Sequence, residues 1–148
     1  MLRSPAADMR AFFIGAMVVA AAGVVVSMLA LYAQLRRFQT LHPVLRTDED
    51  LTAFKSLAAA QMYGSLVGLV LAWVPLALWA IGKFVFGVVG WLDALLFVAL
   101  PFVIQLGVAA MTVGAARAVR ATPSDDPNTK SERDRIVDIW LHRNLPNW

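Results

Sequence analysis

The side chains able to do chemistry are few in this sequence and stand far apart. Both histidines, His42 and His142, lie outside three long charge-free runs. Haem or chlorophyll inside a membrane would normally be held by a histidine within a helix. The nearest carboxylate, Asp93, lies only at the end of a run, so the paired groups that catalysis within the membrane would need are missing. Cysteine is absent, and no zinc-protease, serine-hydrolase, Walker or dinucleotide motif occurs. We therefore expect no enzymatic activity, no catalytic or metal-binding residue and no cofactor.

Gln105 is the candidate intramembrane polar residue, because it lies near the middle of the third charge-free run. Polar groups in lipid usually face protein or water. We expect Gln105 to form a hydrogen bond with another helix. The alternative is a polar path across the membrane, which would need polar partners at the same depth that the sequence does not supply.

The elements that position these residues are the charge-free runs themselves: Ala11–Leu35, Ser56–Gly82 and Ala94–Ala116. A helix of about 20 apolar residues crosses about 30 Å of hydrocarbon, and each run is longer than that. The chain is 59% hydrophobic, whereas soluble domains are about 45–50% apolar. The sequence predicts an all-α integral membrane protein with three transmembrane helices and a short amphipathic C-terminal helix.

The runs divide the chain into seven segments. These are an N-terminal arm (1–10), transmembrane helix 1 (11–35), a cytoplasmic connection (36–55), transmembrane helix 2 (56–82), a short outer hairpin (83–93), transmembrane helix 3 (94–116) and a cytoplasmic tail (117–148) with an amphipathic helix at about 131–145.

The distribution of cations predicts the orientation, because cytoplasmic segments carry an excess of Lys and Arg. On one side lie Arg3, Arg10 and Lys83, and on the other lie Arg36, Arg37, Arg46, Lys55, Arg117 and Arg120. This favours an N-terminus outside and a C-terminus in the cytoplasm. Arginine outnumbers lysine, and alanine and valine dominate the spans, as is typical of GC-rich bacterial genomes. We expect a multi-pass protein of the bacterial inner membrane.

Small residues recur four positions apart in every run, a spacing that lets helix backbones approach closely in lipid. The predicted helix-packing residues are Gly64 and Gly68, Gly23 and Ser27, and Ala110 and Gly114. The pattern predicts extensive packing, either within the chain or onto other subunits.

The tail contains an apolar face at helical spacing, with Ser131 and Asp134 in the positions of a capping box. The face consists of Ile136, Val137, Trp140, Leu141 and Leu145. Acidic and basic residues balance on the opposite side, so anionic lipid offers this helix little net attraction. We expect the face to dock onto a cytoplasmic-side protein.

Local signals add three expectations about the connections. Thr47 is placed to cap a helix that begins in the first connection. Pro75 and Pro101 remove backbone hydrogen bonds within spans and should kink their helices. Lys83 and Asp93 flank the outer hairpin and are placed to pair across it.

These observations predict a non-catalytic structural or accessory subunit of a larger bacterial membrane protein complex. Its partners would be other integral membrane subunits and the lipid bilayer, with a cytoplasmic-side protein on the tail. The alternative is a small self-assembling channel or transporter subunit, which should show a polar stripe along one helix. A third reading is a membrane anchor that recruits a protein through the tail. The net charge of +3 comes from cations beside the spans, where they meet lipid headgroups, so we expect no nucleic acid.

Overall fold

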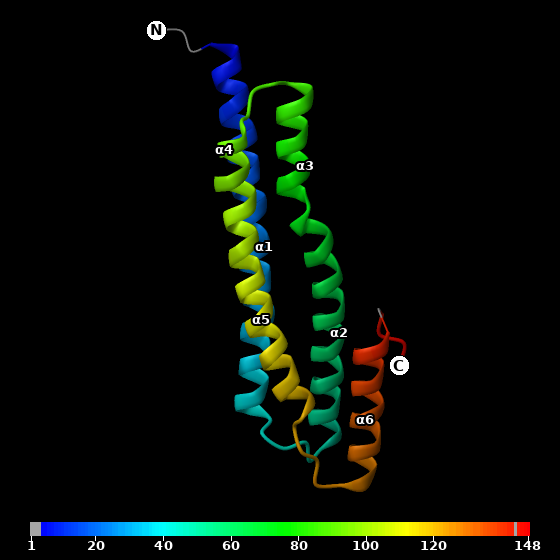
Figure 1. Cartoon of the computed structure of the whole chain (residues 1–148). Coiled ribbons are helices and arrows are strands. Elements are labelled where there is room, and N and C mark those ends of the chain that lie inside the picture. The colour runs from blue at the N-terminus through cyan, green and yellow to red at the C-terminus, as the bar shows by residue number, and fades with distance from the viewer. Residues whose placement is uncertain (1–3, 144) are drawn as a thin grey trace. The chain divides into compact units, whose positions relative to one another are not determined.

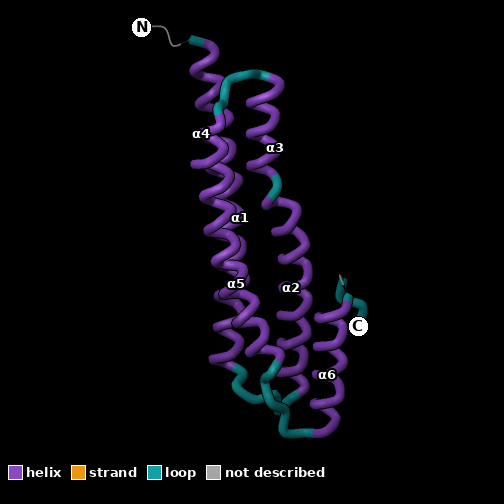
Figure 2. The backbone as a smooth tube through the Cα atoms, viewed as in Figure 1, coloured by secondary structure: helices purple, strands orange, loops and turns teal. Residues whose placement is uncertain are grey.

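The computed structural model describes residues 4–143 and 145–148, and their regular elements are all helices (Figures 1 and 2). In chain order they are α1 (Pro5–Leu41), α2 (Asp48–Ala72), α3 (Val74–Ala80), the π-helical η1 (Ile81–Val85), α4 (Trp91–Ala94), the π-helical η2 (Leu95–Ala99), α5 (Leu100–Arg120) and α6 (Pro127–His142). Three long helical stretches, Pro5–Leu41, Asp48–Val85 and Trp91–Arg120, are long and apolar enough to cross a membrane. The predicted all-helical architecture with three helices long and apolar enough to span a membrane is confirmed. Arg3, used above to predict orientation, lies outside the described residues.

Both prolines within the charge-free runs coincide with irregular helix geometry. The α-helix is interrupted at Trp73, and α3 begins at Val74 with Pro75 in its first turn, where a missing N–H costs nothing. Pro101 follows the π-helical segment η2, and such segments commonly mark a local rearrangement of the hydrogen-bond ladder. Each proline therefore lies at or just after a departure from regular α-helix geometry.

The described residues form two compact units. Of the described residues, the first unit comprises 4–27 and Gly68–Val108, and the second comprises Met28–Val67, 109–143 and 145–148. In the first unit, a small core brings together Phe13 and Met17 of α1, Trp79 of α3 and Val89 of the hairpin. The hairpin turns at Gly87, whose φ of +65° favours glycine because it has no Cβ.

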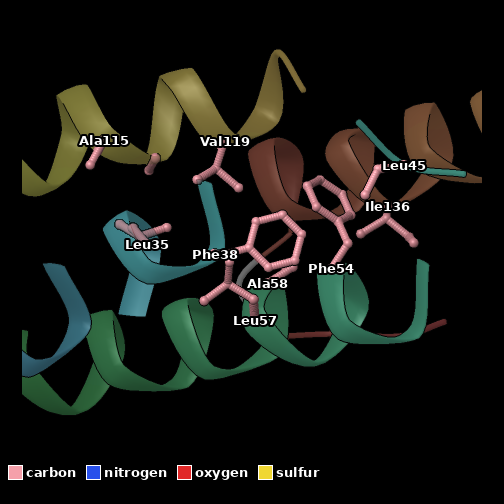
Figure 3. Close-up of a cluster of buried hydrophobic side chains, with 10 residues drawn as sticks. Leu35, Phe38, Leu45, Phe54, Leu57, Ala58, Ala115, Val119 and Ile136 are labelled. Atoms are coloured by element: carbon pink, nitrogen blue, oxygen red, sulfur yellow. The ribbon is translucent and has the colours of Figure 1, made fainter. Parts of the chain in front are cut away.

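The second unit is organised around Phe54, whose side chain is 0% exposed. Its ring packs beside Phe38, at 5.8 Å between centroids, and edge-on to Trp140 of α6, at 6.2 Å. Figure 3 shows the surrounding side chains converging from α1, α2, α5, α6 and the connection after α1. We call this set the Phe54 cluster: Leu35, Phe38, Leu45, Phe54, Leu57, Ala58, Ala115, Ala116, Val119 and Ile136.

Two connections of the second unit meet at their backbones. Leu45 and Ser124 form an isolated parallel β-bridge, in which Leu45 N–H donates to the carbonyl of Pro123 at 2.9 Å. Thr47 caps α2 as predicted, because its Oγ1 accepts the N–H of Asp50 at 3.2 Å. The start of α6 was placed too late: the helix begins at Pro127, and the Asp126 carboxylate accepts the N–H groups of the next turn.

Candidate functional site

Gly64 lies at a close crossing of α1 and α2 within the second unit. A Cβ added there would come within 2.7 Å of the Leu31 side chain, so only glycine fits without a shift of that side chain. One turn earlier, Gln61 is 3% exposed, and its Nε2 donates to the backbone carbonyl of Leu31 at 2.9 Å. Gly64 and Gln61 therefore fix contacts within the chain, and Gly64 is not available to another subunit. The sequence does not reveal this role of Gln61, because nothing in it shows which backbone carbonyl the side chain contacts.

The other predicted packing glycines lie in open surroundings. Nothing comes within 4 Å of the position a Cβ would take at Gly23, Gly68 or Gly114. Ser27 is exposed, and its hydroxyl donates to the carbonyl of Gly23 at 2.8 Å. Ala110 is also exposed. These small residues are therefore notches on helix faces that their own units leave uncovered.

An apolar groove in the first unit includes one of these notches. Gly23 and Ser27 line it together with other residues of α1, and the kinked end of α2 with Val74 of α3 supplies the opposite wall. Its volume is about 240 Å³. A second apolar groove, of about 370 Å³, lies between α1 and the segment around Pro101, with Phe97 and Ile104 on its wall.

Gln105 is buried but not satisfied. The residue is 5% exposed, and its Oε1 has no hydrogen-bond partner among the described residues. The predicted hydrogen bond to another helix is therefore not made by this oxygen. A buried acceptor without a donor typically costs about 1–3 kcal/mol, so the position is a weak point in the packing of α5.

The apolar face of the tail is divided between two environments. Ile136 is 1% exposed and belongs to the Phe54 cluster, and Val137 and Trp140 pack against that cluster. Leu141 and Leu145 are 54% and 47% exposed. Leu145 was predicted to lie on the same helix face, but α6 ends at His142, so Leu145 lies beyond the helix. The expectation that the whole face needs a separate protein is corrected for the first three residues, because their burial is supplied by their own chain. Only the last two residues remain open to a partner.

At the hairpin of the first unit, Asp93 pairs with a residue far away in the sequence. The Nη2 of Arg10 lies 2.9 Å from Oδ1 of Asp93, and the N–H of Gly90 donates to Oδ2 at 2.7 Å. Asp93 is 3% exposed, although Arg10 remains about half exposed. The predicted pairing with Lys83 is wrong: the ammonium of Lys83 instead lies 6.0 Å from the ring centroid of Trp91.

In the first connection, Asp50 organises the turn after α1. Its carboxylate accepts the backbone N–H groups of Arg46 at 2.9 Å and Thr47 at 3.0 Å, and Nδ1 of His42 lies 2.6 Å away. The N–H of Arg46, followed by His42, lowers the pKa of Asp50 from 3.8 to about 2. Asp50 lies outside the charge-free runs, so solvent can exchange protons with it.

This geometry predicts a pH dependence of the connection. Because the pKa of Asp50 is lower in the folded protein than in the unfolded chain, its stabilisation is complete above about pH 4. It is lost as the pH falls from 3.8 towards 2. Carbon NMR of the Asp50 carboxyl should give a midpoint of about 2, and His42→Ala should raise that midpoint while leaving it below 3.8. A midpoint of 3.8 in the unsubstituted protein would contradict the hydrogen bonds described.

Within the described residues, no group of three or more histidine, cysteine or acidic side chains could hold a metal ion.

The chain matches no family model, and no curated protein or solved structure shows significant similarity to it.

Proposed function

We propose that the protein is a non-catalytic structural subunit of a larger bacterial membrane protein complex. The observation that carries the proposal is the contrast among its packing glycines. Gly64 is covered by its own chain, whereas Gly23, Gly68 and Gly114 have open space at the Cβ position. In lipid, such notches allow the backbone of a second helix to approach closely. A helix packed there makes more van der Waals contacts than a flexible lipid chain would.

A self-assembling channel is the second candidate, and the polar groups argue against it. A pore formed between copies would need polar side chains on the exposed face of a span. Of the three glutamines in the charge-free runs, Gln61 is 3% exposed and Gln105 is 5% exposed. The third, Gln34, is exposed but lies next to the last residue of its run, so it does not form a polar stripe along the span. Absence of ion or solute flux in reconstituted liposomes would agree with the structural role, and a specific flux would favour the channel.

The proposal includes an orientation and a location. The N-terminus lies outside, and the tail and first connection lie in the cytoplasm of a bacterium, as the excess of cations beside those segments favours. Other integral membrane subunits would occupy the open glycine faces. A cytoplasmic-side protein would contact the tail through Leu141 of α6 and Leu145 beyond the helix, which are the exposed members of the predicted docking residues.

Two leucine substitutions separate packing within the chain from packing between chains. Gly68→Leu should weaken association with partner subunits about tenfold, as for a residue at the centre of an interface, and leave the fold unchanged. Gly64→Leu should instead destabilise the protein itself by about 1–3 kcal/mol, because the new side chain collides with Leu31. The measurements are the amount of partner recovered on mild-detergent purification and the thermal unfolding of the purified chain.

A matched control is Val70→Leu, which changes size at a site that is already 63% exposed on the same helix. It should affect neither measurement. If Gly68→Leu recovers the same partners in the same amounts as the unsubstituted protein, that face contacts lipid, and the proposed packing role of Gly68 is wrong.

A further inference from the structure

Cations of the second unit gather at the ends of the charge-free runs without carboxylate partners. Arg117 is the first residue after the run Ala94–Ala116, and Arg120 follows one turn later. Lys55 immediately precedes the second run, and Arg36 immediately follows the first. Among the described residues, no ion pair joins any of these four to an acid. Their positions in the sequence place them where the hydrocarbon of a bilayer gives way to phosphate groups.

The acidic residues of the same unit are mostly engaged elsewhere. The carboxylates with partners are Asp50 with His42, Asp125 with Arg46, Asp126 with the first turn of α6, Glu132 with Arg135, Asp134 with Arg133, and Asp138 with His142. All of them lie beyond the span ends in the sequence. The charge at the span ends is therefore not balanced by the chain itself.

Arg120 is held in a defined position despite its lack of an anion. Its guanidinium lies 5.4 Å from the centroid of the Trp140 ring, and that ring packs against Phe54 of the cluster. Arg120 is partly buried, and the like charge of Arg117 lies three residues before it on the same helix. Two arginines three residues apart lie on the same side of a helix, so an anion placed between them would relieve their repulsion.

We propose that Arg117 and Arg120 bind the phosphate of an anionic phospholipid. Guanidinium groups match phosphate oxygens with two parallel hydrogen bonds, and a partly desolvated arginine keeps its charge. The occupant is a lipid because an apolar surface adjoins the cations. Val113, one turn before Arg117 on the same side of α5, is 54% exposed and offers contact to an acyl chain. The inference does not depend on the chain joining a larger complex.

The test measures lipid binding to the full chain purified in a neutral detergent. Native mass spectrometry would count bound dioleoyl-phosphatidylglycerol, with dioleoyl-phosphatidylcholine as the zwitterionic probe. Phosphatidylglycerol should bind more tightly. Arg117→Gln should weaken that binding about fivefold, as expected for one cation near a membrane surface, and leave phosphatidylcholine unaffected. Arg117 is exposed and outside the Phe54 cluster, so its replacement should not disturb the fold.

Further variants and a competing anion test whether the binding is specific to these two arginines. Arg120→Gln should add a second loss of about fivefold. Lys130→Gln, which removes an exposed cation from the first turn of α6 instead, should have almost no effect. Inorganic phosphate at millimolar concentration should not displace the lipid. Four results would each overturn the proposal. The two lipids could bind equally tightly, or Lys130→Gln could weaken phosphatidylglycerol binding as much as Arg117→Gln does. Arg117→Gln could leave the affinity for phosphatidylglycerol unchanged, or free phosphate could displace the lipid.

Discussion

Replacing Phe54 with alanine should cost about 3–5 kcal/mol of stability in the second unit and release α6 from it. Phe54 is 0% exposed and contacts both Phe38 of α1 and Trp140 of α6. The residue lies just before a charge-free run, and the two rings it contacts, Phe38 and Trp140, also lie outside the runs. The cost of the substitution is therefore the usual one for a buried aromatic ring: the free energy of burying its apolar surface and the free energy of the cavity that it leaves.

Limited proteolysis measures this effect directly. Arg133 and Arg135 lie within α6, and trypsin should cut there much faster in Phe54→Ala than in the unsubstituted protein, because an undocked helix of 16 residues is marginal in water. Leu41→Ala is the matched control, since Leu41 is 60% exposed at the end of α1 in the same unit. Equal cleavage rates in the two variants would show that the Phe54 cluster does not hold the tail.

The positions of the long helices could be predicted from the sequence, because insertion into lipid requires a simple local pattern of apolar residues. Long charge-free runs, a threonine cap at Thr47 and the proline at Pro75 each act within a few residues, and the structure shows the three long helices, the cap and the interruption at Trp73. The start of α6 was missed because two capping signals compete there. Asp126 followed by Pro127 outweighs the signal at Ser131, since proline in the first turn already has helical geometry.

The candidate sites were harder to predict because they depend on which surfaces meet. Gly64 and Gly68 belong to one sequence motif, yet only Gly64 meets a neighbouring side chain of its own chain. Helical periodicity likewise showed that Ile136 must be buried, but it carries no information on whether the chain or a partner covers it. Both questions concern contacts between segments distant in the sequence, which no local pattern encodes.

The ion pair of Asp93 is the sharpest example of this limit. Lys83 is ten residues away across a hairpin, whereas Arg10 is separated by 83 residues, and proximity in sequence favoured the wrong partner. Arg10 reaches the carboxylate because α1 packs beside the hairpin through Phe13 and Met17. The buried core of the first unit therefore decides which cation approaches Asp93.

Asp93→Ala should destabilise the first unit by about 2–3 kcal/mol, as expected when a charged hydrogen-bonding group is removed and its donors are left unpaired. Asp93→Asn should cost less, because its carbonyl oxygen can still accept the N–H of Gly90. Trp79 is a local reporter, since its Nε1 donates to the carbonyl of Gly90 at 3.0 Å and its ring packs 4.9 Å from Trp91.

Thermal unfolding in mild detergent, followed by tryptophan emission, should rank the variants in that order. Asp8→Ala is the matched control, because it removes an exposed carboxylate from the first turn of α1 and should cost less than about 1 kcal/mol. In the Arg10→Ala background, Asp93→Ala should lose less stability than it does alone, since the ion pair is already gone. Equal losses in both backgrounds would mean that Arg10 and Asp93 do not interact energetically, and that Gly90 alone makes Asp93 important to the hairpin.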